Sequence, residues 1–164
     1  MCIRDRAYGA LANGGKLMQL QTIDRVESSE GANLMSASSE TISEVLDPQT
    51  ASFIREALHN VTLDGGGYKT RSKLYRFGGK TGTTQKYDVE LKKYSPNKRI
   101  ASFAGIAPIS DPHVVIYVVV DEPGKKPYYG SLWAAPIFKK IAEQTLSYLN
   151  VKPSHPKFNL AKKP

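Results

Sequence analysis

The sequence predicts an α+β fold in which an antiparallel sheet is flanked by helices. Three segments carry strand signals: Arg76 to Gln85, Ile100 to Ile106 and Val114 to Val120. They follow one another through short polar connections, as antiparallel neighbours can. Helical signals precede and follow them, and the order helix, helix, three strands, helix indicates mixed layers around one sheet. The 164 residues suit one domain or a large piece of a bigger one.

The first part of the chain predicts the end of a helix and then a peripheral ribbon. Residues 7–13 carry the last helical turns, and Gly14-Gly15 supplies the stop signal. Lys16 to Val26 alternates only partly and predicts an outlying ribbon, and the polar stretch from Glu27 to Ser39 predicts a loop. Residues 1–6 show no pattern continuous with the helix and resemble a translated sequencing adapter. We therefore expect them to be a non-native scar.

A second helix is predicted to begin at Asp47-Pro48, because aspartate is a favoured N-cap and proline suits the first helical position. Its apolar residues recur at helical spacing and share one face. They are Phe53, Ile54, Ala57, Leu58 and Val61.

The later segments predict a buried strand and a closing helix. Val114 to Val120 is almost entirely β-branched, which is typical of a strand buried on both faces. Pro96-Asn97 and Asp111-Pro112 predict the turns between strands. Pro136 is expected to open the last helix, with an apolar stripe. The stripe consists of Ile137, Ile141, Leu146 and Leu149. The lysine- and proline-rich residues 152–164 predict a flexible tail.

Composition narrows the function classes. The net charge of +8 and the pI near 9.5 raise the alternative of a basic module that binds nucleic acid or an anionic polymer. Such a module needs a dense basic cluster with exposed aromatic residues, whereas these charges are spread, so no specific nucleic-acid partner is expected. The single cysteine, Cys2, excludes an internal disulfide. The three histidines lie far apart in sequence, so neither a metal site nor a cofactor is expected.

The stretch "FGGKTGTTQK", residues 77–86, is the main candidate site. A phosphate-binding P-loop is excluded by spacing, because Leu74 stands where that motif needs its first glycine. On an edge strand, Lys80 and Gly82 share one face while Thr81 and Thr83 share the other. Such an edge can bind an extended peptide, and lysine with threonine hydroxyls can hold its carboxylate. Gly82 leaves room for a backbone or ligand to approach closely.

Four segments together resemble the C-terminal portion of a class B penicillin-binding protein transpeptidase domain, over residues 7–151. They are "AYGALANGGKLMQ", "FGGKTGTTQK", "ASFAGIAPISDPHVVIYVVVDEP" and "YYGSLWAAPIF". The last two are most similar to the cell-division, or septal, branch. The resemblance implies a penicillin-binding and serine β-lactamase-like fold. It also implies a peptidoglycan D,D-transpeptidase that cross-links stem peptides in septal cell-wall synthesis. A serine β-lactamase or D,D-carboxypeptidase carries the same motif and remains the alternative.

The resemblance also implies roles for single residues. Lys80 would keep the site positive and support proton movement, and the Thr81 and Thr83 hydroxyls would bind the terminal carboxylate of the substrate. The Thr83 backbone N–H would be an oxyanion-hole donor. Gly82 and Thr84 would complete the substrate-binding strand, although Thr84 stands where the family often has alanine.

The expected partners are equally implied by the resemblance. The donor would be a stem peptide ending in D-Ala-D-Ala, and β-lactams would inhibit the enzyme. The parent protein would contact membrane proteins of the division machinery. It would be anchored in the inner membrane with this domain in the periplasm.

The family nucleophile, a serine in a Ser-x-x-Lys motif, has no convincing match. Ser95 to Lys98 and Ser154 to Lys157 fit formally, but both follow the Lys-Thr-Gly motif and contain proline, which spoils the helical turn. We therefore expect a fragment that carries one wall of the site and is inactive alone.

Asp121-Glu122 is not interpreted as an acid–base pair, because adjacent strand residues face opposite ways. A structural role is predicted for that pair.

Overall fold

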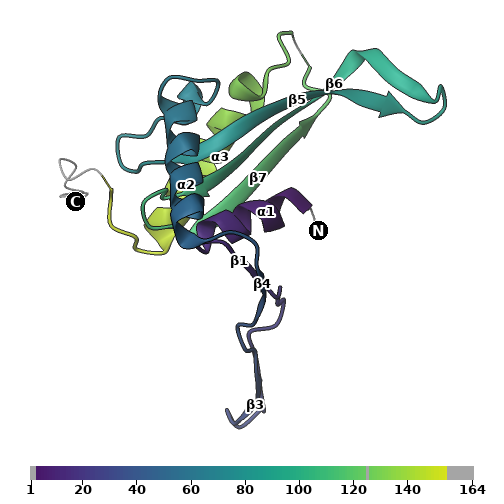
Figure 1. Cartoon of the computed structure of the whole chain (residues 1–164). Helices are drawn as coiled ribbons and strands as arrows, with labels where there is room; N and C mark the ends of the chain where they lie inside the picture. The colour runs from purple at the N-terminus through teal and green to yellow at the C-terminus, as the bar shows by residue number, and fades with distance from the viewer. Residues whose placement is uncertain (1–2, 125, 155–164) are drawn as a thin grey trace, which may run out of the picture.

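The computed structural model describes residues 3–124 and 126–154. Its helices are α1 (Ile3–Ala12), α2 (Pro48–Leu63) and α3 (Gly130–Tyr148), with a 3-10 turn, η1, at Tyr68–Thr70. Its strands are β1 (Lys16–Met18), β2 (Arg25–Glu27), β3 (Asn33–Ser36), β4 (Thr41–Glu44), β5 (Gly78–Asp88), β6 (Lys93–Ala107) and β7 (Val114–Asp121). Strands β5, β6 and β7 form one antiparallel sheet in that order (Figure 1). The predicted α+β fold and the three adjacent strands are confirmed.

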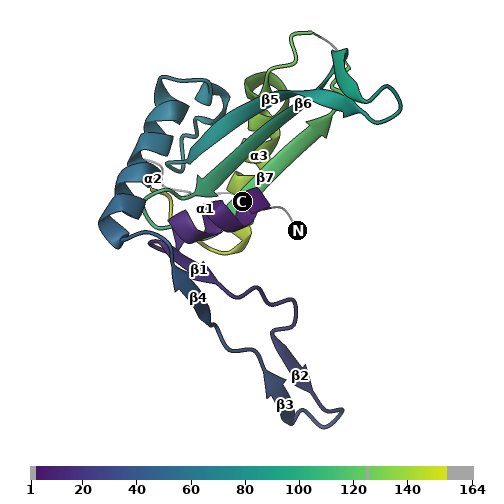
Figure 2. The ribbon, with the colours of Figure 1, turned by 45° about the vertical axis from the view of Figure 1, so that its right-hand side comes forward.

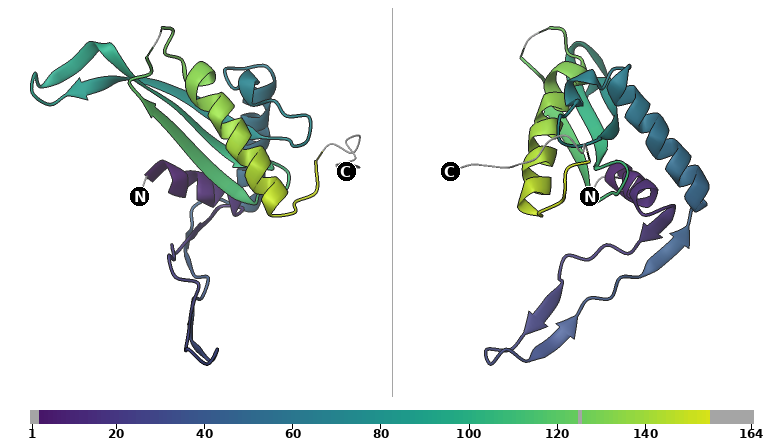
Figure 3. Two further views of the ribbon diagram at one scale, coloured as in Figure 1. Left: turned by 180° about the vertical axis from the view of Figure 1, so that it is seen from behind. Right: turned by 90° about the vertical axis from the view of Figure 1, so that its left-hand side faces the viewer.

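The central sheet lies between helices. Helix α3 covers one face, α1 lies on the opposite face, and α2 runs beside β5 (Figure 3). The core forms between α3 and the sheet, where the Phe138 ring contacts those of Phe77 and Phe103 at centroid distances of 5.6 and 4.8 Å. This core fixes the sheet and therefore the strand that carries the motif.

The segment between α1 and α2 forms a long arm that projects from the body (Figures 1 and 2). Strand β1 pairs with β4 and β2 pairs with β3, each antiparallel. The predicted loop from Glu27 to Ser39 is therefore wrong in part, since β3 lies within it. All four β3 residues are exposed, so the sequence shows no alternation of apolar and polar residues from which this strand could be predicted.

Helix α1 ends as predicted, and Gly14 and Gly15 follow it with φ of 68° and 98°. These left-handed values favour glycine, which carries no side chain to clash there. Ile3 to Arg6 continue the same helix. The non-native origin of residues 1–6 stays a prediction.

Helix α2 begins as predicted, but its buried face is only partly the predicted one, because Ile54, Leu58 and Val61 are half-buried. Asp47 caps it, its Oδ1 accepting a hydrogen bond from the Thr50 amide at 2.8 Å. Phe53, on the predicted apolar face, is 76% exposed. The buried residues are instead Ala51, His59 and Thr62. The polar pair is buried because both side chains bind the backbone at the start of β5.

Helix α3 begins at Gly130, six residues before the predicted start, and Pro136 lies inside it. The predicted stripe is wrong except for Leu146, because Ile137, Ile141 and Leu149 are 43%, 39% and 47% exposed. The buried stripe combines four small residues with two large ones: Gly130, Ala134, Ala135 and Ala142, with Phe138 and Leu146. The alanines allow α3 to approach the sheet closely while Phe138 fills the centre.

The sheet differs from the prediction at its far end. Strands β5 and β6 continue beyond β7 as a two-stranded ribbon with its turn at residues 89–92 (Figure 1). Pro96-Asn97 does not connect strands but lies within β6, where the Ser95 hydroxyl accepts hydrogen bonds from the next amides. Strand β7 is not buried on both faces, since Val119 is 49% exposed and α1 covers only part of that face. Asp111-Pro112 lies in the β6–β7 connection as predicted.

Within the described residues, no helix is both long and apolar enough to cross a membrane. Most of the predicted tail, residues 155–164, lies outside the described part of the chain.

Candidate active-site groove

Strand β5 holds the Lys-Thr-Gly-Thr motif at an edge of the central sheet. It pairs with β6 through a regular antiparallel register that sets Lys80 opposite Ala104 and Gly82 opposite Ser102. In the sheet of the described residues, β5 has no strand on its other side. The motif therefore lies on an edge strand, where main-chain groups can accept an added peptide.

A groove of about 290 Å³ runs along this strand. Residues from β5, β6, β7 and α1 line it. They are Arg4, Tyr8, Lys80, Thr81, Gly82, Thr83, Thr84, Ser102, Ala104 and Tyr117. All five sequence-predicted site residues border the same groove. Lys80 is exposed, and its Nζ donates to the Thr81 carbonyl oxygen at 3.2 Å.

Gly82 lies where the groove floor meets the central strand, β6. A Cβ at this position would lie 2.5 Å from the Ser102 Oγ, so the serine hydroxyl occupies the space that a side chain would take. Ser102 is 7% exposed and borders the groove beside Lys80 and Gly82. Sequence reasoning did not single out Ser102. Ser102 could be found only from its position opposite Gly82, and that position is known only once the register of β5 against β6 is known.

Thr83 is held by the first residue of α3. The Gly130 amide donates a hydrogen bond to the Thr83 Oγ1 at 3.1 Å. Helix α3 has no side-chain cap at Tyr129, so the Thr83 hydroxyl satisfies one of its free N-terminal amides across the fold. Because this bond uses a lone pair of the oxygen, the Thr83 O–H remains available as a donor.

The residues just before the motif are anchored to α2. The Phe77 carbonyl accepts a hydrogen bond from His59 Nδ1 at 2.7 Å, and Thr62 Oγ1 lies 2.9 Å from the same oxygen. Arg76 Nε donates to His59 Nε2 at 3.1 Å, which leaves His59 Nδ1 as the donor. Arg76 also pairs with Glu56 at 2.9 Å. This network holds Phe77, which immediately precedes β5 and lies three residues before Lys80.

Asp121 and Glu122 have the structural role that was predicted, but the expectation that they face opposite ways is wrong. Both accept hydrogen bonds from Lys86 Nζ, at 2.7 and 2.8 Å, because Glu122 lies just beyond β7 with a φ of 49°. Among the described residues, no group of three or more histidine, cysteine, aspartate or glutamate side chains could hold a metal ion.

The fold and the groove together define the class of protein: an α+β domain in which an edge strand of the sheet presents lysine and threonine to a groove. Residues 6–143 match the family model described as the penicillin binding protein transpeptidase domain, and the chain belongs to this family.

Known relatives agree with this assignment. The probable peptidoglycan D,D-transpeptidase PenA of Neisseria flavescens is 32% identical over 157 residues, which cover 95% of this chain and 36% of that protein. The stage V sporulation protein D of Bacillus subtilis is 44% identical over 110 residues, which cover 67% of this chain and 17% of that protein. This chain thus spans well under half the length of either relative.

Solved structures show the same fold. The transpeptidase domain of Burkholderia pseudomallei penicillin-binding protein 3 superposes with a TM-score of 0.74 at 34% identity. The match covers 93% of this chain and 43% of that one. Penicillin-binding protein 3 of Mycobacterium tuberculosis, complexed with aztreonam, gives a TM-score of 0.77 at 27% identity, covering 93% of this chain and 36% of that one. The expected penicillin-binding fold is therefore confirmed.

Proposed function

We propose that this chain supplies the carboxylate-binding wall of a serine-type peptidoglycan D,D-transpeptidase. The observation that carries the proposal is the placement of Lys80, Thr81 and Thr83 together along one groove on a free strand edge. The substrate is a stem peptide ending in D-Ala-D-Ala, and β-lactams compete for the same groove. The names of the relatives, and the aztreonam complex of a structural neighbour, support both parts.

Each residue has a distinct role in this proposal. The substrate lies extended along β5, and the Thr81 and Thr83 O–H groups donate to its terminal carboxylate, with Lys80 supplying positive charge. The Thr83 amide donates to the oxyanion that forms during acyl transfer, a contribution of about 3 kcal/mol in comparable sites. Gly82 and Thr84 form the rest of the strand against which the substrate lies.

We infer that the nucleophilic serine belongs to a part of the parent protein outside this sequence. Ser95 lies nine residues along β6 from Ala104, the residue opposite Lys80, and its hydroxyl accepts hydrogen bonds from the Asn97 and Lys98 amides. Ser102 borders the groove but is 7% exposed, and a glycine follows it three residues later instead of lysine. Ser95 lies in a strand and Ser102 has no lysine three residues later, so neither forms the helical Ser-x-x-Lys turn that activates the family nucleophile.

The test on the chain itself is incubation with a fluorescent penicillin followed by intact-mass spectrometry. The expected result is no covalent adduct, because acylation needs an activated serine oxygen. A penicilloyl adduct on any serine, Ser102 included, would overturn the inference about the nucleophile. A Ser102→Ala variant identifies the site if an adduct appears.

The test on the parent protein uses the complete reading frame that contains this chain. We expect acylation there, strongly slowed by Lys80→Ala and partly slowed by Thr83→Val, which keeps the backbone amide but loses the hydroxyl. Thr83→Ser retains the hydroxyl and should stay close to wild type. Lys93→Ala, which removes an exposed lysine of the distant ribbon, is the charge-matched control. Equal rates for Lys80→Ala and Lys93→Ala would refute the role of Lys80.

The septal assignment and the cellular location are part of the same proposal. The "VVVDEP" and "YYGSLWAAP" segments support a cell-division enzyme whose parent is anchored in the inner membrane and contacts division proteins there. This domain would then act in the periplasm, where the stem peptides are.

A further inference from the structure

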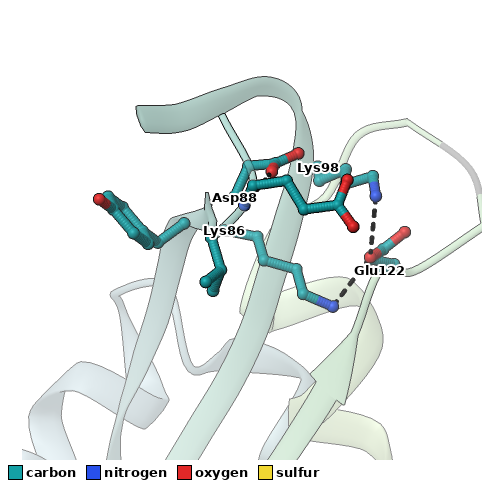
Figure 4. Close-up of a pocket in the computed structure, with 7 residues that line it drawn as sticks. Lys86, Asp88, Lys98 and Glu122 are labelled. Atoms are coloured by element: carbon teal, nitrogen blue, oxygen red, sulfur yellow. Dashed lines mark hydrogen bonds and ion pairs between the residues drawn. The ribbon is translucent and has the colours of Figure 1, made fainter. Parts of the chain in front are cut away.

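Lys86 joins β5 to the end of β7. The β5–β6 register shifts between Gln85 and Tyr87, and such a bulge re-aims a side chain away from the regular ladder. Figure 4 shows the Lys86 side chain crossing to Glu122, with Lys98 reaching the same carboxylate. The Lys86 Nζ lies 2.7 Å from Asp121 Oδ2 and 2.8 Å from Glu122 Oε1, whereas the Lys98 contact is longer, at 3.7 Å.

The acceptor residues stand at the start of the connection that leads into α3. Glu122 has a φ of 49°, a left-handed value that is uncommon for a residue other than glycine and needs support from its surroundings. The Glu122 amide donates to the Arg99 carbonyl at 2.9 Å, and its carboxylate is bound by Lys86. Hydrogen bonds to Asp121 and to Glu122 raise the pKa of Lys86, and the bond from Lys86 lowers the pKa of Glu122.

The connection between β7 and α3 is thus attached to β5 at both of its ends. At its beginning Glu122 binds Lys86, and at its end the Gly130 amide binds the Thr83 hydroxyl. Lys86 and Thr83 are three residues apart on the same strand. Further along the connection, the Trp133 Nε1 donates to the Pro127 carbonyl at 3.1 Å and joins it to the first turn of α3.

We propose that Lys86 is a positioning residue, whose contacts with Asp121 and Glu122 hold the β7–α3 connection where the Gly130 amide reaches Thr83. The inference rests on the proposed function, because it gives Thr83 a fixed hydroxyl with its proton free for the substrate carboxylate. Exposed ion pairs add little to global stability. The effect of Lys86 should therefore be local, at Gly130 and Thr83.

The experiment is backbone amide hydrogen exchange, measured by NMR on the 164-residue chain and four variants. Thr83→Val removes the acceptor of Gly130 directly and sets the upper limit for its exchange rate. Lys86→Met keeps the length of the side chain but removes the ammonium group. It should raise the Gly130 rate by roughly five-fold, while β6 amides change little. Lys86→Arg should keep the protection. Lys98→Met removes a charge from the same Glu122 without touching β5, and should change the Gly130 rate by less than about two-fold.

Two outcomes would overturn the proposal. One is an unchanged Gly130 rate in Lys86→Met while Thr83→Val raises it. The other is a uniform rise over all amides, which would make Lys86 an ordinary stabilising residue. Because the exchange measurement uses no substrate, it is independent of the penicillin test. A parent protein that fails to acylate would remove the proposed function and leave the exchange result standing.

Discussion

The Gly130 amide donates a hydrogen bond to the Thr83 side-chain oxygen at 3.1 Å, across 47 residues of sequence. A residue of the groove is therefore also the acceptor for the first amide of α3. We expect Thr83→Val to leave the Gly130 amide without its partner and to lower the free energy of unfolding by about 1 kcal/mol. Thr83→Ser keeps the oxygen and should lose much less. Urea denaturation of both variants measures the difference, and equal losses would contradict the bond's contribution.

Gly130 itself is the subject of a second prediction. A Cβ there would lie 2.3 Å from the Ser102 carbonyl oxygen and 2.7 Å from that of Gly82, both backbone atoms that cannot swing aside. Gly130→Ala should therefore destabilise the chain by about 2 kcal/mol, in spite of the better helix propensity of alanine.

The control for this prediction is Gly9→Ala, also in a helix. A Cβ at Gly9 has no neighbour within 4 Å, so propensity alone should act and the variant should be unchanged or more stable by up to about 1 kcal/mol. Thermal unfolding followed by circular dichroism compares the two. A Gly130→Ala protein as stable as Gly9→Ala would show that α3 does not approach β5 and β6 as closely as described.

The central sheet was predictable because its signals are local. Val114 to Val120 is β-branched, Lys80 to Thr83 carry a recognisable motif, and short turns separate the strands. The same kind of signal located the start of α2, where Asp47 binds the amide of Thr50 three residues later. Strand period and helix capping depend on neighbours in sequence, so the sequence displays them directly. Turn signals did so only in part: Asp111-Pro112 lies between strands, whereas Pro96-Asn97 lies inside β6.

The features that were missed depend on partners far apart in sequence. The start of α3 was missed because its cap is Thr83, not a residue beside it. The buried face of α2 was misassigned in part because His59 and Thr62 are buried in order to bind the Phe77 carbonyl, which an apolar pattern does not reveal. Ser102 belongs to the groove only through its register opposite Gly82.

A third prediction separates the real core from the predicted one. Phe138 is fully buried against Phe77, which precedes β5, and Phe103 of β6, whereas Phe53 on α2 is 76% exposed. Phe138→Ala should cost about 3–5 kcal/mol, because it leaves a cavity against Phe77 and Phe103. Phe53→Ala should change stability by less than about 0.5 kcal/mol. Denaturant unfolding decides between them, and a large loss in Phe53→Ala would restore the apolar face predicted from the sequence.

The last prediction concerns the pH dependence of stability. Hydrogen bonds from Lys86 hold the pKa of Glu122 below its ordinary 4.5, and bonds within the N-cap hold that of Asp47 below 3.8. A lowered pKa in the folded state means that the folded chain binds fewer protons than the unfolded one in this range. The stability from these groups is therefore complete above pH 4.5 and is lost as the pH falls through the folded values.

The alkaline side has the opposite sign. Hydrogen bonds to Asp121 and Glu122 hold the pKa of Lys86 above 10.5, so its contribution is complete below that pH and is lost as the pH rises through the raised value. Burial, with a smaller effect from Glu143, also raises the pKa of Tyr75, which adds to the alkaline loss. Lys86→Met should remove the part of the alkaline loss of stability that comes from Lys86 and leave the part that comes from Tyr75.

On the acid side, Glu122→Gln should reduce the loss of stability as the pH falls. Asp47→Ser keeps a capping oxygen and should remove only the part of that loss that comes from Asp47. Denaturation midpoints measured across the pH range check each part. Acid and alkaline curves that are identical in wild type, Lys86→Met and Glu122→Gln would show that Lys86 and the carboxylates do not interact in solution.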